Sequence, residues 1–183
     1  MTRSQTPLSL EYILLGFIFE NPIHGYDLYK KISDFKGISL VWHIKQSQLY
    51  ALLEKLEDEG LLTSNLIPGE AHLIRKEFQI TPTGKKTFLT WISSPVTHGR
   101  LMRQEFLAKL YFAQKSGVED FMGLIEAQKT VSAEWLSNLQ VSYSKTTDGQ
   151  HYERMIFQYR ISQIQAMLEW LDYCLTEIQG IFS

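Results

Sequence analysis

The sequence has a single cysteine, no long apolar segment and no excess of positive charge. With Cys174 alone, an internal disulfide is excluded and no set of thiols exists for a structural zinc site. No apolar run reaches the roughly 18–20 residues that a membrane-spanning helix needs. The opening segment "MTRSQTPLSLEY" also lacks the apolar core of a secretory signal. We therefore expect a cytoplasmic protein with no membrane partner.

Charge is balanced in both halves of the chain. The 183 residues include 18 Lys and Arg against 20 Asp and Glu, which gives a net charge of −2. Residues 1–92 carry ten charges of each sign, and residues 93–183 carry eight basic and ten acidic residues. Because nucleic-acid binders usually carry a basic surface, a DNA-binding function has to rest on where individual charges stand.

Patterns for catalysis and metal binding are missing as well. The five histidines, at positions 24, 43, 72, 98 and 151, show neither HExxH nor HxxxH spacing. The sequence has no glycine-rich phosphate loop and no nucleophile elbow. Acidic pairs such as Glu57 and Glu59 are interpreted as a solvated helix end. We therefore expect neither an enzyme nor a bound cofactor or metal.

Periodicity predicts helices and one hairpin in the first half of the chain. Apolar residues at helical spacing predict helices over residues 9–19, 26–33, 46–59 and 81–92. Gly60 follows the third of these at the position that favours left-handed backbone. The β-branched "ISLVW" predicts an extended stretch within residues 34–44. The segment "LLTSNLI" and the alternating "LIRKEFQIT" predict a β-hairpin across Pro68 and Gly69.

Three helices followed by a hairpin are typical of the winged helix-turn-helix, whose third helix enters the major groove of DNA. The start of the 46–59 helix is rich in polar groups, namely Lys45, Gln46, Ser47, Gln48 and Tyr50. Gln can hydrogen-bond a base edge bidentately, while Ser and Tyr hydroxyls commonly contact phosphates. Taken alone, this turn is more simply interpreted as a capped, solvated helix end. In this order of elements, we expect it to bind DNA.

The hairpin supplies further candidates. Arg75 and Lys76 on the returning strand stand where a wing meets DNA, and each is expected to neutralise about one phosphate. His72 at the tip is expected to contribute in the same way, whereas Glu70 opposes phosphate. The alternative for these residues is ordinary solvated strand charge. Tyr26 of "HGYDL" is interpreted either as core or as a phosphate contact. A looser basic rim is expected from lysines 30, 31, 36 and 45.

The second half predicts a different architecture. Residues 93–99, "SSPVTHG", are interpreted as a linker that separates a domain over 1–92 from a helical domain over 93–183. Helical patterns follow over residues 102–113, 118–143 and 152–179. The last pattern has an a/d heptad seam typical of a coiled coil. Its members are Phe157, Ile161, Ile164, Leu168, Leu171, Leu175 and Ile178.

This apolar face is wider than one partner helix needs. The seam suits the 118–143 helix folding back as an antiparallel hairpin. A second row widens the face and comprises Met155, Tyr159, Met167, Trp170 and Cys174. A second copy of the chain is the simplest further partner, so we expect a homodimer and assign the seam to dimerisation. The large aromatic residues are expected in core and dimer packing, with a pocket for a small aromatic effector as the alternative. They are Trp91, Phe106, Tyr111, Phe112, Trp135, Tyr143 and Trp170.

Three segments together resemble the PadR family of bacterial transcriptional regulators. They are "ILLGFIFENPIHGYDLYKKI", "SQLYALLEKLEDEGLL" and "RKEFQITPTGKKTF", which span roughly residues 9–92 in the family's order. The resemblance implies a homodimer that binds a pseudo-palindromic operator and usually represses the adjacent gene. By position, it implies roles for Tyr26, Ser47, Tyr50, Arg75 and Lys76. Two departures stand out: Ala51 replaces a frequent proline, and "PGEAHL" lacks the usual arginine before the Arg-Lys pair.

The sequence therefore predicts a mainly α protein with a small β-hairpin. An N-terminal winged helix-turn-helix domain would precede a C-terminal antiparallel helical dimerisation domain with a coiled-coil-like last helix. The expected function is a sequence-specific, homodimeric transcriptional regulator, more often a repressor, with double-stranded operator DNA as its partner and a small-molecule effector left open. The alternative is a winged-helix module that binds protein, for which the neutral N-terminal half is equally suited.

Overall fold

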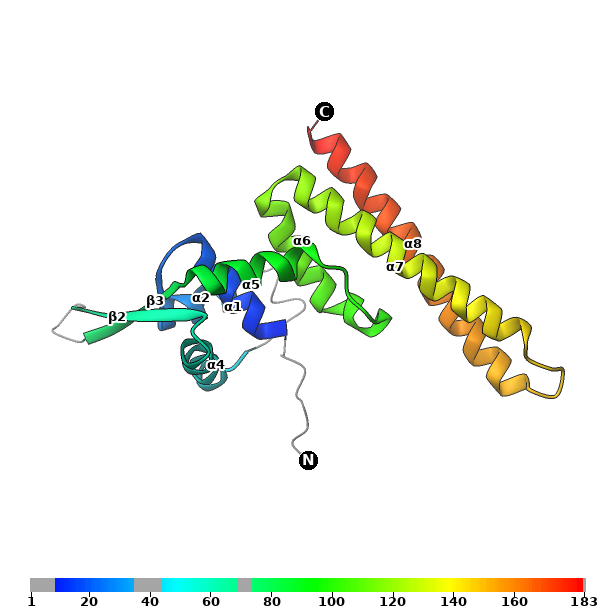
Figure 1. Ribbon diagram of the computed structural model, residues 1–183, viewed down its shortest axis with the longest axis horizontal. Helices are drawn as coiled ribbons and strands as arrows, with labels where there is room; N and C mark the ends of the chain where they lie inside the picture. Colours follow the sequence, from blue (N-terminus) through cyan, green and yellow to red (C-terminus); the bar gives the residue numbers. More distant parts are fainter. Residues whose placement is uncertain (1–8, 35–43, 69–73, 183) are drawn as a thin grey trace. The chain divides into compact units, whose positions relative to one another are not determined.

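The computed structural model describes residues 9–34, 44–68 and 74–182. Within these ranges, the chain is mainly helical with one small antiparallel sheet, which confirms the predicted fold class (Figure 1). The predicted extended stretch within residues 34–44 falls almost entirely outside the described residues. So do two candidate site residues, Lys36 and His72.

The first half follows the predicted order of helices and hairpin. Its elements are α1 (Ser9–Glu20), β1 (Ile23–His24), α2 (Gly25–Asp34), α4 (Gln46–Asp58), β2 (Leu62–Pro68), β3 (Ile74–Ile80) and α5 (Pro82–Ser93). The strand order is β1-β3-β2, so β3 lies in the middle and pairs antiparallel with both neighbours. Strand β1 was not predicted. A two-residue strand is too short to show periodicity, so only the structure reveals its pairing with Phe78 and Glu77.

Helix α4 lies beside the base of the β2–β3 ribbon (Figure 1). It buries a leucine stripe (Leu49, Leu53 and Leu56) in the core, and each of these side chains is at most 1% exposed. The helix ends as predicted, because Gly60 adopts a left-handed φ of 70° that favours glycine. The alternation predicted for β3 is also found, since Phe78 and Ile80 are buried on one face. These contacts fix which side of α4 faces outward.

Helix α5 begins directly after β3 at a tight junction. The Thr81 hydroxyl accepts a hydrogen bond from the Gly84 N–H at 3.0 Å, so Thr81 caps the helix. The same hydroxyl donates to the carbonyl of Gly60 at 2.8 Å. Gly84 is required here, because a Cβ at this position would lie 2.1 Å from the Leu61 carbonyl oxygen. The end of α4, the sheet and α5 are therefore tied together at one point.

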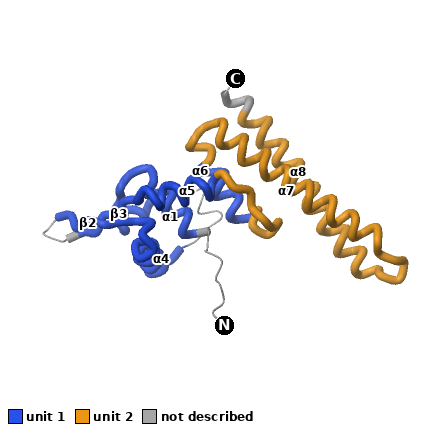
Figure 2. Tube along the Cα trace, in the orientation of Figure 1, with its two compact units in different colours: residues 1–92, 103–112 blue, residues 93–102, 113–183 orange. Residues whose placement is uncertain are grey.

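The chain divides into two compact units (Figure 2). Residues 1–92 and 103–112 form unit 1, and residues 93–102 and 113–183 form unit 2. The chain enters unit 2 at the expected linker but returns to unit 1 for ten residues that the sequence analysis had placed in the second domain. Ala108 and Phe112 explain the return, because both are buried in the core of unit 1. Gly16 on α1 makes room for the Phe112 ring, which lies 2.6 Å from where a Cβ would stand.

Unit 2 is dominated by a long helical hairpin. After the 3-10 helix η2 (Gly99–Arg103), α6 (Glu105–Ser116) leads into α7 (Val118–Ser144) and α8 (His151–Phe182), which run antiparallel side by side (Figure 1). Ile161 and Ile164 of the predicted seam are buried against Leu139 of α7. No helix among the described residues has the length and apolar character needed to cross a membrane.

Candidate nucleic-acid interface

The first turn of α4 faces outward. Lys45, Gln46, Ser47 and Gln48 are all exposed, while Leu49, the next residue, is fully buried. Lys45 is the N-cap residue with an extended backbone, and its side chain makes no capping hydrogen bond within the described residues. Of the simpler interpretation as a capped, solvated helix end, the solvation is found, and among those residues the cap is not. The first backbone N–H groups and four long or polar side chains are directed outward together, which suits contacts to phosphates and base edges.

Two tyrosines lie beside this turn. Tyr26, in the first turn of α2, is 60% exposed, and Tyr50 is 37% exposed. The Tyr50 ring lies over Gly25, since a Cβ built on Gly25 would be 2.7 Å from its Cε1 atom. This close approach brings the start of α2 against the start of α4. The structure thus places both predicted tyrosines near the polar turn, with Tyr26 on the surface rather than in the core.

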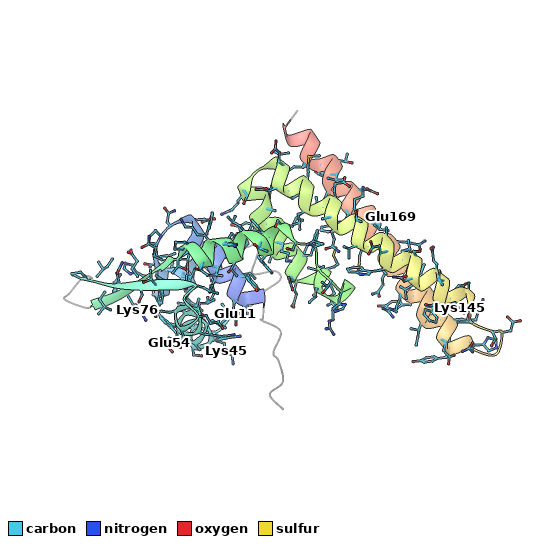
Figure 3. All side chains as sticks on the ribbon, in the orientation of Figure 1. Glu11, Lys45, Glu54, Lys76, Lys145 and Glu169 are labelled. Carbon is cyan, nitrogen blue, oxygen red and sulfur yellow. The ribbon has the colours of Figure 1, made fainter. Side chains whose placement is uncertain are left out.

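The two basic residues of β3 differ sharply in their surroundings. Arg75 is exposed on the face of the strand opposite to Phe78 and Ile80. Lys76 shares the face of those buried residues, and its Nζ atom lies 2.5 Å from Glu57 Oε2 on α4 (Figure 3 labels Lys76). The sequence therefore grouped two residues that the fold separates.

Glu57 joins α4 to both strands of the hairpin. Its Oε1 accepts a hydrogen bond of 2.6 Å from the Ser64 hydroxyl on β2, and its Oε2 accepts one from Lys76 on β3. The hydrogen bonds from Lys76 and Ser64 lower the pKa of the Glu57 carboxyl below its ordinary value. The interpretation of Glu57 as a merely solvated helix end is therefore wrong.

Other charges near the interface are of both signs. Lys31 pairs with Glu20 at 2.6 Å, and Lys55 pairs with Glu11 at 2.7 Å. Lys30 and Lys45 are exposed. The outward face of α4 continues beyond its first turns with the exposed Glu54, which Figure 3 shows on the same helix as Lys45. The local charge around α4 is therefore mixed rather than uniformly basic.

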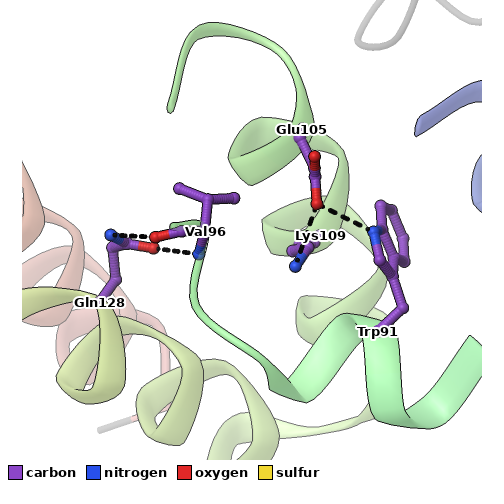
Figure 4. Close-up of polar contacts among 5 residues, drawn as sticks. All are labelled: Trp91, Val96, Glu105, Lys109 and Gln128. Carbon is purple, nitrogen blue, oxygen red and sulfur yellow. Dashed lines mark hydrogen bonds and ion pairs between the residues drawn. The ribbon is translucent and has the colours of Figure 1, made fainter. Parts of the chain in front are cut away.

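A buried polar cluster links α5 to α6 within unit 1. Lys109 is 2% exposed, and its Nζ atom lies 3.3 Å from Glu105 Oε1 and 5.3 Å from the centre of the Trp91 ring. The Trp91 indole N–H donates to the same Glu105 oxygen at 3.2 Å (Figure 4). Burial lowers the pKa of Lys109, and the neighbouring Glu105 opposes that shift. These contacts hold the first turns of α6 on α5.

A second buried polar contact holds the linker inside unit 2. Gln128 on α7 is fully buried and accepts a hydrogen bond of 2.7 Å from the Val96 backbone N–H (Figure 4). Its amide also donates to the Val96 carbonyl at 3.4 Å. One side chain thus pairs with both backbone groups of a linker residue.

The described residues contain no group of three or more His, Cys, Asp or Glu side chains placed to hold a metal ion.

The predicted dimerisation residues lie on the inner side of the α7–α8 hairpin. Ile161, Ile164, Leu171 and Ile178 are buried, and Phe157, Leu168 and Leu175 are half-buried. A different set of apolar side chains on α8 is exposed, namely Tyr152, Met155, Ile156 and Tyr159 at 41–69%. Met155 and Tyr159 belong to the second row of the sequence analysis. Of the large aromatic residues, Trp91, Tyr111 and Phe112 pack in the core of unit 1, Trp135 and Tyr143 pack against the core of the α7–α8 hairpin, and Phe106 is buried.

Comparisons with known proteins agree with these features. Residues 14–90 match the family model "Transcriptional regulator PadR-like family", and residues 102–179 match "Virulence activator alpha C-term". The chain is 26% identical over 180 residues to the negative transcriptional regulator PadR of Bacillus subtilis, covering 92% of this chain and 97% of that protein.

Three solved structures are also similar to the chain. The crystal structure of Bacillus subtilis PadR in complex with operator DNA is 23% identical, with 94% of this chain and 99% of that chain covered and a TM-score of 0.49. The same protein in complex with p-coumaric acid is 24% identical over the same shares, with a TM-score of 0.43. The smu.1604c protein of Streptococcus mutans is 20% identical, with coverage of 91% and 98% and a TM-score of 0.44.

Proposed function

Because its residues 14–90 place the chain in the PadR-like family of transcriptional regulators, we propose that it is a repressor that binds a pseudo-palindromic DNA operator as a homodimer. Regulators of this family are DNA-binding proteins and not enzymes. Repression is supported by the Bacillus subtilis relative, which is named a negative transcriptional regulator. The match to this chain covers 97% of that protein. Binding to chromosomal DNA also requires the cytoplasmic location that the sequence analysis expects.

The observation that carries the proposal is the outward, uncapped first turn of α4. Its exposed Gln46, Ser47 and Gln48 follow an N-cap without a side-chain hydrogen bond, and the helix is fixed from behind by its buried leucine stripe. In a winged helix-turn-helix, this end of the third helix contacts base edges. We assign base contacts to Gln46 and Gln48, and phosphate contacts to Lys45, Ser47, Tyr26 and Tyr50. Arg75 of the hairpin remains a predicted wing contact, and so does His72, which lies outside the described residues. For Lys76, the pairing with Glu57 sets the predicted phosphate contact aside.

The exposed apolar row of α8, formed by Tyr152, Met155 and Tyr159, is better suited than the seam to contact a second copy of the chain. The seam residues Ile161 and Ile164 are already buried against α7 of the same chain. Tyr152, Met155 and Tyr159 are 63–69% exposed on one stretch of α8, which leaves a large apolar area in water. Burying apolar area is the main favourable term in protein association. We therefore propose that the seam supports the hairpin and that this row contacts the partner copy.

The test of the proposal is a fluorescence anisotropy titration at about 150 mM salt, where non-specific binding is weak. One fragment comes from upstream of the protein's own gene, and a scrambled fragment of equal length is the control. A preference of about a thousandfold or more is expected of a specific operator. The variants Gln46→Ala and Gln48→Ala should lose this preference. Equal, weak binding of both fragments, together with tight binding of a protein partner to the α4 surface, would favour the winged-helix interaction module instead.

Assembly is tested separately by sedimentation. Met155→Glu places a charge in the exposed row and should shift the protein from dimer to monomer. Gln165→Glu adds the same charge to the same helix at an exposed polar position and should leave the dimer intact. If both variants stay dimeric, the row on α8 is not the contact. Relief of repression by a small aromatic effector stays the alternative that the large aromatic residues leave open.

A further inference from the structure

The junction between α4 and the β2–β3 hairpin carries an inference that rests on the proposed DNA-binding function. We propose that Glu57 is a positioning residue that holds Lys76, so that this lysine fixes the wing against the recognition helix and does not neutralise a DNA phosphate. Here α4 is the recognition helix and β2–β3 is the wing. Arg75 alone of the two neighbouring basic residues then contacts the DNA backbone.

The placement of Lys76 supports the first half of this proposal. The alternation of β3 puts Lys76 on the same face as the buried Phe78 and Ile80. At Lys76 this face is already partly open to solvent, since the lysine side chain is 41% exposed, but its ammonium group is directed to α4. Its Nζ atom lies 2.5 Å from Glu57 Oε2 and 5.2 Å from the centre of the Phe78 ring. The ammonium group is thus held by a carboxylate on one side and an aromatic face on the other.

Glu57 makes the link rigid because both of its oxygens are used. Oε2 accepts from Lys76 on β3, and Oε1 accepts from the Ser64 hydroxyl on β2 at 2.6 Å. Ser64 lies opposite Phe78 in the strand pairing, two positions along β3 from Lys76. One side chain of α4 is therefore bonded to both strands of the wing. The wing cannot tilt away from α4 without breaking at least one of these hydrogen bonds.

The electrostatic consequence concerns counterion release. Log affinity falls as log salt concentration rises, and the magnitude of that fall is called the slope from here on. Each lysine or arginine that neutralises a phosphate displaces condensed counterions and adds about 0.9 to this magnitude. A lysine that keeps its carboxylate partner in the complex adds nothing to that slope. Arg75 is exposed on the opposite face of β3 and remains able to contact phosphate. Of these two cations, only Arg75 should therefore contribute to the salt dependence of DNA binding.

The experiment measures DNA affinity across a series of salt concentrations for the wild-type protein and three variants. Arg75→Ala should lower the slope by about 0.9. Lys76→Ala should leave the slope unchanged while weakening operator binding several-fold, because the wing is no longer aimed. Glu57→Gln frees Lys76 and should raise the slope by about 0.9. If Lys76→Ala lowers the slope as much as Arg75→Ala does, Lys76 contacts phosphate and the proposal is overturned.

A conservative variant separates aiming from general damage to the fold. Lys76→Arg keeps a cation opposite Glu57 and should restore the operator affinity that Lys76→Ala loses. Lys76→Gln is the matched control, since it keeps a polar side chain at this position but removes the charge. If glutamine restores affinity as well as arginine does, the charge pair with Glu57 does not position the wing.

A measurement without DNA keeps this inference distinct from the proposed function. The midpoints of thermal unfolding are compared for Glu57→Gln, Lys76→Met and the double variant. The proposal expects the two shifts to be clearly non-additive, because each single change breaks the same ion pair. Additive shifts overturn the link itself. Non-additive shifts in a protein that shows no salt-dependent DNA binding overturn the proposed function, and with it the assignment of Arg75, but leave the wing link standing.

Discussion

A single methyl group at position 84 should disrupt the junction that holds the wing. A Cβ on Gly84 lies 2.1 Å from the Leu61 carbonyl oxygen and 2.9 Å from Ile80 Cγ1. The carbonyl cannot easily retreat, because it accepts hydrogen bonds from the Thr81 N–H at 3.1 Å and the Thr81 hydroxyl at 3.2 Å. Overpacking of this kind costs about 1–3 kcal/mol, against at most about 1 kcal/mol gained from the helix preference of alanine. With so short a contact, we expect Gly84→Ala to destabilise unit 1 by about 2 kcal/mol.

The same substitution elsewhere supplies the control. Gly123 lies inside α7 with no atom within 4 Å of its built Cβ, so Gly123→Ala should stabilise unit 2 by about 0.5–1 kcal/mol. Urea unfolding followed by circular dichroism measures both, with each variant compared at the transition of its own unit. With a slope near 2 kcal/mol per molar urea, the Gly84→Ala midpoint should fall by about 1 M. A midpoint equal to or above that of the wild type would refute the close approach of α5 to Leu61.

Three further changes test other parts of the molecule. Arg75→Ala should weaken binding to operator and to random DNA by similar factors, whereas Gln48→Ala should reduce the ratio of operator affinity to random-DNA affinity. Equal losses on both fragments for both variants would contradict the assigned roles. Gln128→Leu leaves the buried Val96 N–H without its acceptor and should cost about 1–3 kcal/mol in thermal unfolding, and an unchanged midpoint would contradict this role of Gln128. Burial lowers the pKa of Lys109, so the folded state disfavours its charged form. Wild-type stability relative to Lys109→Met should therefore rise from pH 7 toward the ordinary lysine pKa of about 10.4, and a flat difference would show that the amine is not desolvated.

The regular elements were predictable because their signals are local. The leucine stripe of α4 and the left-handed Gly60 depend on a few neighbouring residues, and both the helix and its end were found where the sequence predicts them. The two-residue strand β1 was missed because it is defined only by its pairing with β3. The return of residues 103–112 to unit 1 was missed for the same reason. Phe112 has ordinary helical periodicity, and only the space beside Gly16 shows which core it joins.

The candidate site was predictable in its polar turn but not in its ion pairs. Gln46 and Gln48 stand out from the sequence because they precede a buried stripe without being needed for it. The partnership of Lys76 with Glu57 was missed, although the strand alternation already grouped Lys76 with the inward-facing Phe78. That grouping was a usable signal, since a lysine on the same strand face as buried apolar residues favours a carboxylate partner nearby. The choice between the seam and the second row as the outer surface of α8 depended on which side α7 covers, which periodicity alone cannot decide.

The return of α6 to unit 1 determines which fragment of this protein can be cut out intact. A recombinant piece that stops at Ile92 would carry every residue proposed to contact DNA, yet it would lack Ala108 and Phe112 from its own core. Phe112 is 3% exposed and makes an edge-to-face contact with Phe88 at 5.3 Å between ring centres. Losing one such side chain removes about 1.5–3 kcal/mol of stabilisation by apolar burial, and it exposes the apolar side chains that Phe112 covers to water. A proteolytic fragment of the regulator should therefore survive only if cleavage falls beyond residue 112, after the second pass of the chain through this core.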